Sequence, residues 1–190
     1  MVIEIKAETS NRHVHLCEED FKVLFGENAE LTVKKMLGKA EFAANETVTV
    51  EGSKRSMSGV RILGPYRKAT QVELLASDCR QIGVDAPVTE SVADGNAAMI
   101  KIIGPAGTVE KNAAIIAHRH VHLNEQVGRE QMGLDEGQMV KVRVPGERGL
   151  VFENVLVRLH KGPLCVVHLD AEEGNAAGLV SGQNVELISD

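Results

Sequence analysis

A five-residue sequence that occurs twice limits the possible folds of this chain more than any other feature. The residues RHVHL at positions 12–16 return unchanged at positions 119–123, which is 107 positions later. On a β-strand the two histidines of each copy point to one face, about 7 Å apart along the strand. On a helix they would diverge by about 200°. Each copy is therefore predicted to lie on a strand and to offer two imidazoles to a divalent transition metal such as zinc.

The surroundings of the two copies are also similar. Residues 12–26 and 119–133 have equal length, and in both the histidine pair is followed by a short predicted helix and a closing glycine. We expect two similar β units, at approximately residues 1–90 and 91–190, with strands that could be exchanged between them. Residues 85–97 are rich in Asp, Ala, Gly, Ser and Pro, which indicates a linker or an exposed crossing between the units.

The rest of the pattern predicts many short strands and only brief helices. Alternating or β-branched segments indicate strands at 2–6, 31–33, 46–50, 60–63, 71–75, 99–103, 113–117, 139–144, 151–159, 164–168 and 185–188. Short helices are predicted at 17–25, 77–82, 124–132 and 172–179. This mainly β pattern favours barrels or sandwiches over a doubly wound α/β sheet.

Composition excludes several classes of function. A formal charge of −6 argues against a nucleic-acid partner bound through a broad basic face. There is no apolar run long enough to span a membrane and no signal peptide, so we expect no membrane partner. The three cysteines, Cys17, Cys79 and Cys165, are scattered, which indicates a reducing compartment. The expected location is the cytoplasm.

Each histidine pair needs a third ligand if it is to hold a catalytic metal. His168 lies on an apolar strand and Glu73 lies between Val and Leu on another. They are the best candidates, although His168 could instead be a core histidine and Glu73 an outward-facing strand residue. His118 could share the face of the second pair. His160 precedes a Lys-Gly-Pro turn and is expected to be solvated.

Three arginines stand near these positions. Arg12 and Arg119 alternate away from the histidine face, which predicts surface ion pairs. Arg67 follows a Gly-Pro turn, where its guanidinium could hold an anion through two parallel donors. No Ser-His-Asp order or Walker loop is present.

Taken together, these motifs resemble one enzyme family. Residues 10–16, 63–67, 70–73, 119–122, 168–170 and 175–177 are similar to the phosphotransacylases of the propanediol-utilisation type, also called phosphate propanoyltransferases. The motifs extend from residue 10 to residue 177, so the resemblance covers nearly the whole chain.

The resemblance implies two small β-barrels packed together, with a two-metal site between them and Zn²⁺ as the expected ion. It assigns one metal to His13, His15 and Glu73, and the other to His120, His122 and His168. Arg67 matches the arginine that binds phosphate in the family. The implied reaction interconverts propanoyl-CoA or acetyl-CoA and phosphate with acyl phosphate and CoA. We expect phosphate to attack the thioester directly, without an acyl-enzyme.

The expected partners are therefore acyl-CoA, phosphate and acyl phosphate. We also expect a homo-oligomer, with a dimer favoured. Microcompartment members of the family carry an N-terminal extension for encapsulation. The matched region begins about ten residues from Met1, so we expect no shell partner. A dinuclear metallohydrolase acting on a thioester or phosphate ester is the alternative, since it needs the same ligands. A purely structural zinc site is disfavoured, because such sites usually have four protein ligands.

Overall fold

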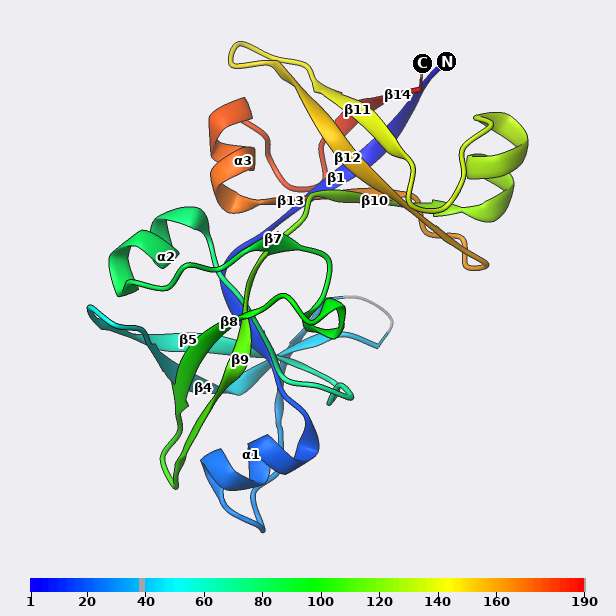
Figure 1. Cartoon of the computed structure of the whole chain (residues 1–190). Coiled ribbons are helices and arrows are strands. Elements are labelled where there is room, and N and C mark those ends of the chain that lie inside the picture. Colours follow the sequence, from blue (N-terminus) through cyan, green and yellow to red (C-terminus); the bar gives the residue numbers. More distant parts are fainter. Residues whose placement is uncertain (38–39, 190) are drawn as a thin grey trace. The chain divides into compact units, whose positions relative to one another are not determined.

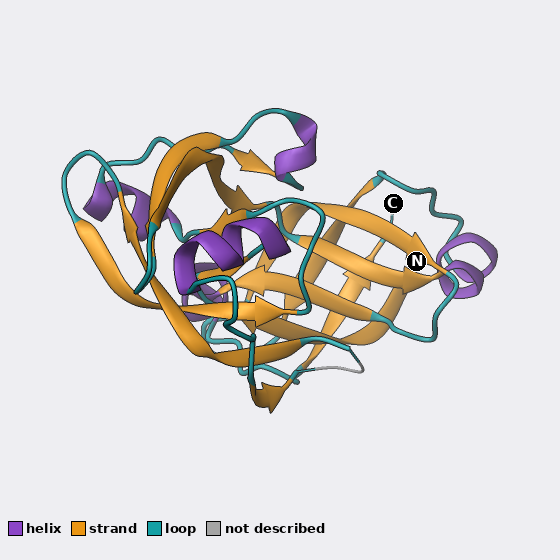
Figure 2. Cartoon of the chain, turned by 90° about the horizontal axis from the view of Figure 1, so that it is seen from below, coloured by secondary structure: helices purple, strands orange, loops and turns teal. Residues whose placement is uncertain are grey.

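The chain forms two units, each built around a closed ring of six strands (Figure 1). The computed structural model describes residues 1–37 and 40–189. Residues 12–117 make one unit, here called the first barrel. Residues 1–11 and 118–190 make the other, here called the second barrel. The prediction of a mainly β protein with two similar barrels is confirmed, and Figure 2 shows how brief the helices are.

The strands of each ring pair in an equivalent order. In the first barrel the ring is β4 (Phe42–Glu51), β5 (Ser56–Gly64), β2 (His13–His15), β6 (Gln71–Glu73), β9 (Thr108–Ala117) and β8 (Ala98–Ile103). In the second it is β11 (Met139–Val144), β12 (Leu150–His160), β10 (His120–Asn124), β13 (Val166–Asp170), β1 (Val2–Ser10) and β14 (Asn184–Ile188). In both, the histidine strand lies between one parallel and one antiparallel neighbour.

The strand that precedes each histidine pair belongs to the ring of the other barrel. Strand β1 leads directly to β2 but pairs with β13 and β14, whereas β9 leads to β10 but pairs with β6 and β8. Apart from three short elements that occur only in the first half of the described chain, the elements of the two halves follow in the same order. The two units therefore divide at residues 11/12 and 117/118.

Short elements complete the two barrels. The first barrel also contains β3 (Val33–Met36), β7 (Val88–Thr89), α1 (Glu18–Phe25), α2 (Ala76–Ile82) and the 3-10 turn η1 (Val92–Asp94). The second contains the π-helical segment η2 (Gln126–Gln131) and α3 (Ala171–Ala177). Among the described residues, none of the helices has both the length and the apolar character needed to cross a bilayer.

The segment predicted as a linker, residues 85–97, lies within the first barrel instead. Its strand β7 pairs in parallel with the end of β9, and the backbone N–H of Val92 donates a hydrogen bond to Oε1 of Gln71 at 3.1 Å. Small polar residues suit a tight surface path as well as a linker. The composition of this segment could not distinguish the two.

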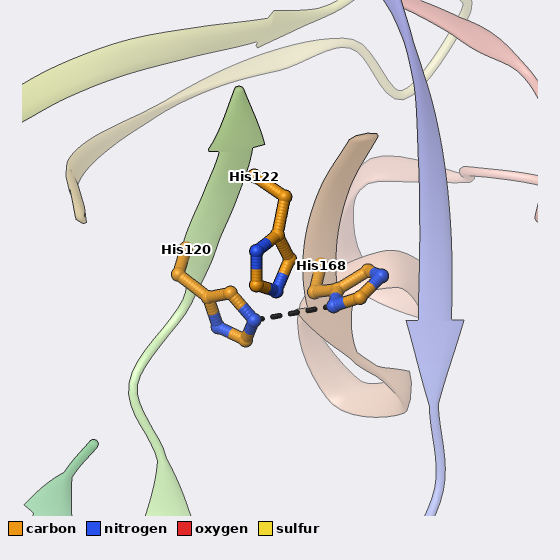
Figure 3. A group of neighbouring side chains, drawn as sticks. All are labelled: His120, His122 and His168. Atoms are coloured by element: carbon orange, nitrogen blue, oxygen red, sulfur yellow. Dashed lines mark hydrogen bonds between the residues drawn. The ribbon is translucent and has the colours of Figure 1, made fainter. Parts of the chain in front are cut away.

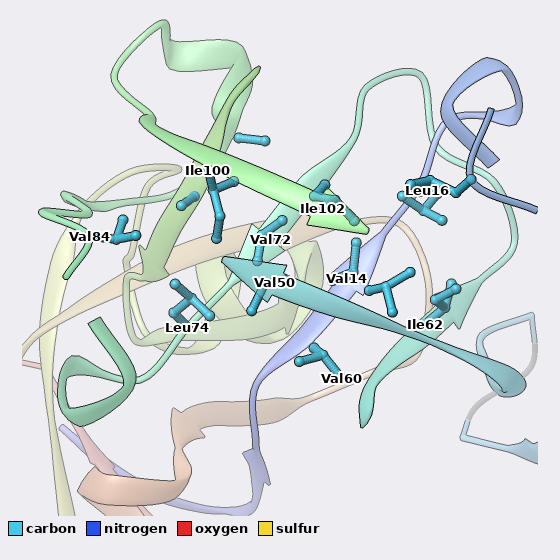
Figure 4. Close-up of a cluster of buried hydrophobic side chains, with 14 of the residues drawn as sticks. Val14, Leu16, Val50, Val60, Ile62, Val72, Leu74, Val84, Ile100 and Ile102 are labelled. Carbon is cyan, nitrogen blue, oxygen red and sulfur yellow. The ribbon is translucent and has the colours of Figure 1, made fainter. Parts of the chain in front are cut away.

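Apolar residues from alternate positions fill the first barrel (Figure 4). Val14, Ile62 and Val72 come from adjacent strands and are fully buried. Since successive side chains on a strand point to opposite faces, burying Val14 in the core turns His13 and His15 to the other face of β2. Val121, between His120 and His122, is buried in the same way in the second barrel. The apolar core therefore fixes the direction of the imidazoles.

A buried acid ties α1 to the first barrel. Asp20 of α1 accepts hydrogen bonds from Nζ of Lys111, at 2.5 Å, and from the hydroxyl of Thr70. The backbone N–H of Cys17 in turn donates to the oxygen of Thr70 at 3.1 Å. Burial alone would raise the pKa of Asp20, but the bonds from Lys111, Thr70 and Cys17 outweigh it and hold the pKa below its ordinary value.

We therefore expect Asp20→Asn to lower the free energy of unfolding by about 1–3 kcal/mol at pH 7. Because the pKa of Asp20 is depressed in the folded state, its contribution is present above the unfolded pKa and is lost as the pH falls through the folded value. The difference between wild type and variant should thus shrink below about pH 4. Urea titrations from pH 3 to pH 7 measure it, with the exposed Asp85→Asn as control. An effect independent of pH would contradict the assignment.

Candidate metal centres

Three side chains of the first barrel converge on one point. Antiparallel pairing of β2 with β6 sets His13 opposite Glu73, and His15 lies two residues along. Nε2 of His13 is 3.2 Å from Nε2 of His15 and 3.3 Å from Oε2 of Glu73. Nε2 of His15 is 3.7 Å from Oε1 of Glu73. These residues form the first cluster, whose donor atoms all lie within 4.8 Å of one another.

The second barrel repeats this arrangement with three imidazoles (Figure 3). Antiparallel pairing of β10 with β13 sets His120 opposite His168, and His122 completes the second cluster. Nδ1 of His168 is 3.1 Å from Nε2 of His120, and the ring centroids of His122 and His168 are 5.2 Å apart. The residues that the sequence suggested as third ligands, Glu73 and His168, thus occupy equivalent positions.

Backbone carbonyls fix which ring nitrogens face into the clusters. Nδ1 of His15 lies 3.2 Å from the carbonyl oxygen of Leu63, and Nδ1 of His120 lies 2.9 Å from that of His118. A carbonyl only accepts hydrogen bonds, so these Nδ1 atoms carry the hydrogen and each neutral ring has its lone pair on Nε2. The lone pair of His120 is therefore directed at the ring nitrogen of His168.

The electrostatics of both clusters keep imidazoles neutral. Burial, followed by the charges of His13 and Arg67, lowers the pKa of His15 to about 3. Burial, followed by the charges of His120 and His160, lowers the pKa of His122 to about 4. Burial alone would raise the pKa of Glu73, but the hydrogen bond and charge of His13 hold it well below its ordinary value. At neutral pH His15 and His122 are therefore neutral and Glu73 is ionised.

These donor sets fit divalent transition metals. Two histidines with a carboxylate, or three histidines, are typical of catalytic zinc sites, in which a further coordination position stays open to substrate. The ring nitrogens of His13 and His15 lie 3.2 Å apart and those of His120 and His168 lie 3.1 Å apart, so one ion could contact both nitrogens of either pair. Metal binding by the two clusters stays a prediction that this geometry supports.

An arginine beside each histidine pair contacts a helix that follows a ligand strand. Nε of Arg12 is 2.7 Å from Oδ2 of Asp78 in α2, and Nη1 of Arg119 is 3.1 Å from Oε1 of Glu173 in α3. Both acids also accept the backbone N–H at the start of their own helix. Asp78 is 1% exposed, so the prediction of a surface ion pair is wrong for Arg12. These pairs anchor the histidine strands to the elements that carry the third ligands.

Two further histidines, His118 and His160, differ in their position relative to the second cluster. His118 is outside both clusters; its Nε2 lies 3.0 Å from the carbonyl oxygen of Asn154. His160 was expected to be solvated, but it ends β12, is half-buried and packs its ring 5.7 Å from that of His122. A neighbouring Lys-Gly-Pro turn indicated exposure, and only the parallel pairing of β12 with β10 brings His160 beside the second cluster.

Arg67 lies near the first cluster. Its charge contributes to the lowered pKa of His15, and its backbone N–H donates to the carbonyl of Leu16 at the end of the histidine strand, at 2.9 Å. The guanidinium is partly exposed and binds Oε1 of Glu41 at 3.2 Å. Sequence reasoning identified Arg67 but gave no indication of Glu41.

Comparisons with known proteins agree on one family. The family model described as phosphate propanoyltransferase matches residues 6–180. A phosphate propanoyltransferase of Thermotoga maritima is 43% identical over 94% of this chain and 86% of the relative. Those of Lachnoclostridium phytofermentans and Sebaldella termitidis are 41% and 42% identical over 94% of this chain, and over 84% and 85% of the relatives. The similarity therefore spans both barrels.

Because each cluster has three ligands of its own, we expect about two divalent ions per chain in protein purified without chelators. His13→Ala should lose roughly one ion and keep the other, and His120→Ala should lose the complementary one. His118→Ala, a histidine variant outside both clusters, should keep two. Elemental analysis of the purified variants gives the stoichiometry. Wild-type protein without bound metal would refute both sites.

Proposed function

The chain belongs to the phosphate propanoyltransferase family and is a phosphate acyltransferase, and from this premise we propose that each of its two clusters holds a divalent metal ion. The proposed reaction converts propanoyl-CoA or acetyl-CoA and phosphate into acyl phosphate and CoA, in either direction. The observation that carries this proposal is the repeated cluster of three possible metal ligands, whose ligand atoms lie within 4.8 Å of one another, with a guanidinium beside the first cluster.

The chemistry needs no nucleophilic side chain. An oxygen of HPO₄²⁻ attacks the thioester carbonyl carbon, the carbon–sulfur bond breaks, and the proton of the phosphate passes to the departing thiolate. Acyl phosphate and CoA result, so atoms and charge balance. Divalent metal ions, when bound, supply Lewis-acid stabilisation of the oxygens that gain charge in this transfer.

The chain's own residues bind and orient the reactants. The guanidinium of Arg67 offers two parallel donors that match two oxygens of a phosphate dianion. Because His15 is neutral and Glu73 is ionised, the first cluster can accept a cation at neutral pH. Arg67 thus supplies positive charge on the side of the cluster where phosphate would enter.

Arg67→Ala should lower the rate of acyl transfer by about 10²–10³-fold and raise the KM for phosphate, because a preorganised charged donor is lost. Arg67→Lys should recover only part of this loss, since an ammonium group cannot reproduce the two parallel donors. Metal content should stay normal. The measurement is steady-state acyl transfer from both acyl-CoA esters at varied phosphate, with Arg61→Ala, another exposed arginine, as control.

The same assay separates the transferase from the metallohydrolase. Loss of thioester that proceeds equally well without phosphate would support hydrolysis, and it would contradict the proposed transfer. Near-normal phosphate saturation of Arg67→Ala would instead leave the reaction intact and remove Arg67 from the phosphate site.

Glu41 should act as a competitor of phosphate for Arg67. Its carboxylate already binds the guanidinium, with both side chains about half exposed. Exposed ion pairs contribute roughly 0.2–1 kcal/mol. Glu41→Gln should therefore lower the KM for phosphate by a factor of up to about five. Glu51→Gln, which removes the comparable ion pair to Lys101, should leave this KM unchanged. The effect of Glu41→Gln should shrink when Arg67 is already Ala, and an undiminished effect would show that Glu41 acts independently of Arg67.

A further inference from the structure

His160 is held in a fixed orientation by the strand that carries two ligands of the second cluster. Its Nδ1 accepts the backbone N–H of Gly162 at 3.1 Å. The carbonyl of Gly162 accepts a hydrogen bond from Nδ2 of Asn124, at 2.8 Å, and Asn124 lies on β10 two residues after His122. The imidazole is therefore positioned by contacts from both β10 and the turn that follows β12.

This hydrogen bond also decides which nitrogen of His160 carries hydrogen. Since Nδ1 accepts, Nε2 is the donor of the neutral ring. Nε2 is buried, and within residues 1–37 and 40–189 it has no hydrogen-bond partner. A buried donor without an acceptor is energetically unfavourable. The ring centroid of His160 is 5.7 Å from that of His122, so this donor belongs to a ring that packs beside the second cluster.

The turn that follows β12 has a topological counterpart in the first barrel. Val14 pairs with Ile62 of β5, as Val121 pairs with Val157 of β12. Arg67 follows Ile62 in the turn after β5, and His160 follows Val157 at the end of β12. Each turn comes after the parallel neighbour of the histidine strand. Each presents a hydrogen-bond donor at its cluster, charged in one barrel and neutral in the other.

We propose that His160 donates a hydrogen bond from Nε2 to the acyl carbonyl oxygen of the thioester bound at the second cluster. A neutral N–H suits a carbonyl oxygen that becomes negative only during transfer, whereas the guanidinium of Arg67 suits the phosphate dianion. Both nitrogens of His160 are engaged or protonated, so it is a substrate-binding residue and not a fourth metal ligand. This inference rests on the proposed function of the two clusters.

His160→Phe keeps the ring volume and removes the donor, while His160→Gln keeps an N–H near the position of Nε2. We expect the Phe variant to lose about 10²-fold in kcat, and the Gln variant to recover at least about 10-fold of it. Metal content, melting temperature and the KM for phosphate should stay close to wild type. His118→Phe is the matched control, since it makes the same change in the same barrel outside the cluster.

A second measurement reports the contact without turnover. Propanoyl-CoA labelled with ¹³C at the carbonyl is bound to the metal-loaded protein in the absence of phosphate, and the carbonyl stretch is recorded by infrared difference spectroscopy. A hydrogen-bonded carbonyl absorbs at lower frequency, so the band should move to higher frequency in His160→Phe and remain low in His118→Phe.

The inference is overturned if His160→Phe keeps kcat within about two-fold of wild type, if it loses the second metal, or if its defect is confined to the KM for phosphate. These outcomes differ from a failure of the proposed function. In that case the wild-type protein itself would lack metal or phosphate-dependent transfer, whatever residue stands at position 160.

Discussion

The antiparallel pairing between a histidine strand and a third-ligand strand is the constraint on which both clusters depend. It sets His13 opposite Glu73 and His120 opposite His168. Because the side-chain period of a strand is two, a register slip of one residue would turn the imidazoles toward the barrel interior and the valines between them toward the cluster. Fully buried Val14 and Val121 oppose such a slip. Core packing and ligand geometry are therefore specified by the same pairing.

Contacts around the clusters reduce what a ligand would have to reorganise. Carbonyls of Leu63 and His118 hold one imidazole in each cluster in the tautomer that turns Nε2 inward. Arg12 and Arg119 tie the histidine strands to helices α2 and α3. Such contacts orient the side chains that coordinate a metal and strengthen metal binding. The arginine contacts occur at equivalent places in both barrels, which argues that the repeat extends beyond the histidine pairs, whereas the carbonyls hold different members of the two pairs.

The two clusters contain different side chains although their strands are connected in an equivalent way. The first cluster contains a carboxylate and has Arg67 beside it, whereas the second consists of imidazoles with neutral His160 beside it. A charged donor favours an anion that is already present, and a neutral donor favours an oxygen on which charge develops later. Under the proposed function this difference separates phosphate from thioester.

The sequence by itself determined the mainly β character, the two histidine strands and the candidate ligands, because alternation and His-x-His spacing act over a few residues. It also indicated Arg67 through its Gly-Pro turn. Only the tertiary structure decided the reciprocal exchange of β1 and β9, the position of residues 85–97 within the first barrel, the buried partner of Arg12 and the place of His160 beside His122. Each of these depends on pairing between segments far apart in the chain, and local composition carries no information about which distant strand will be the neighbour.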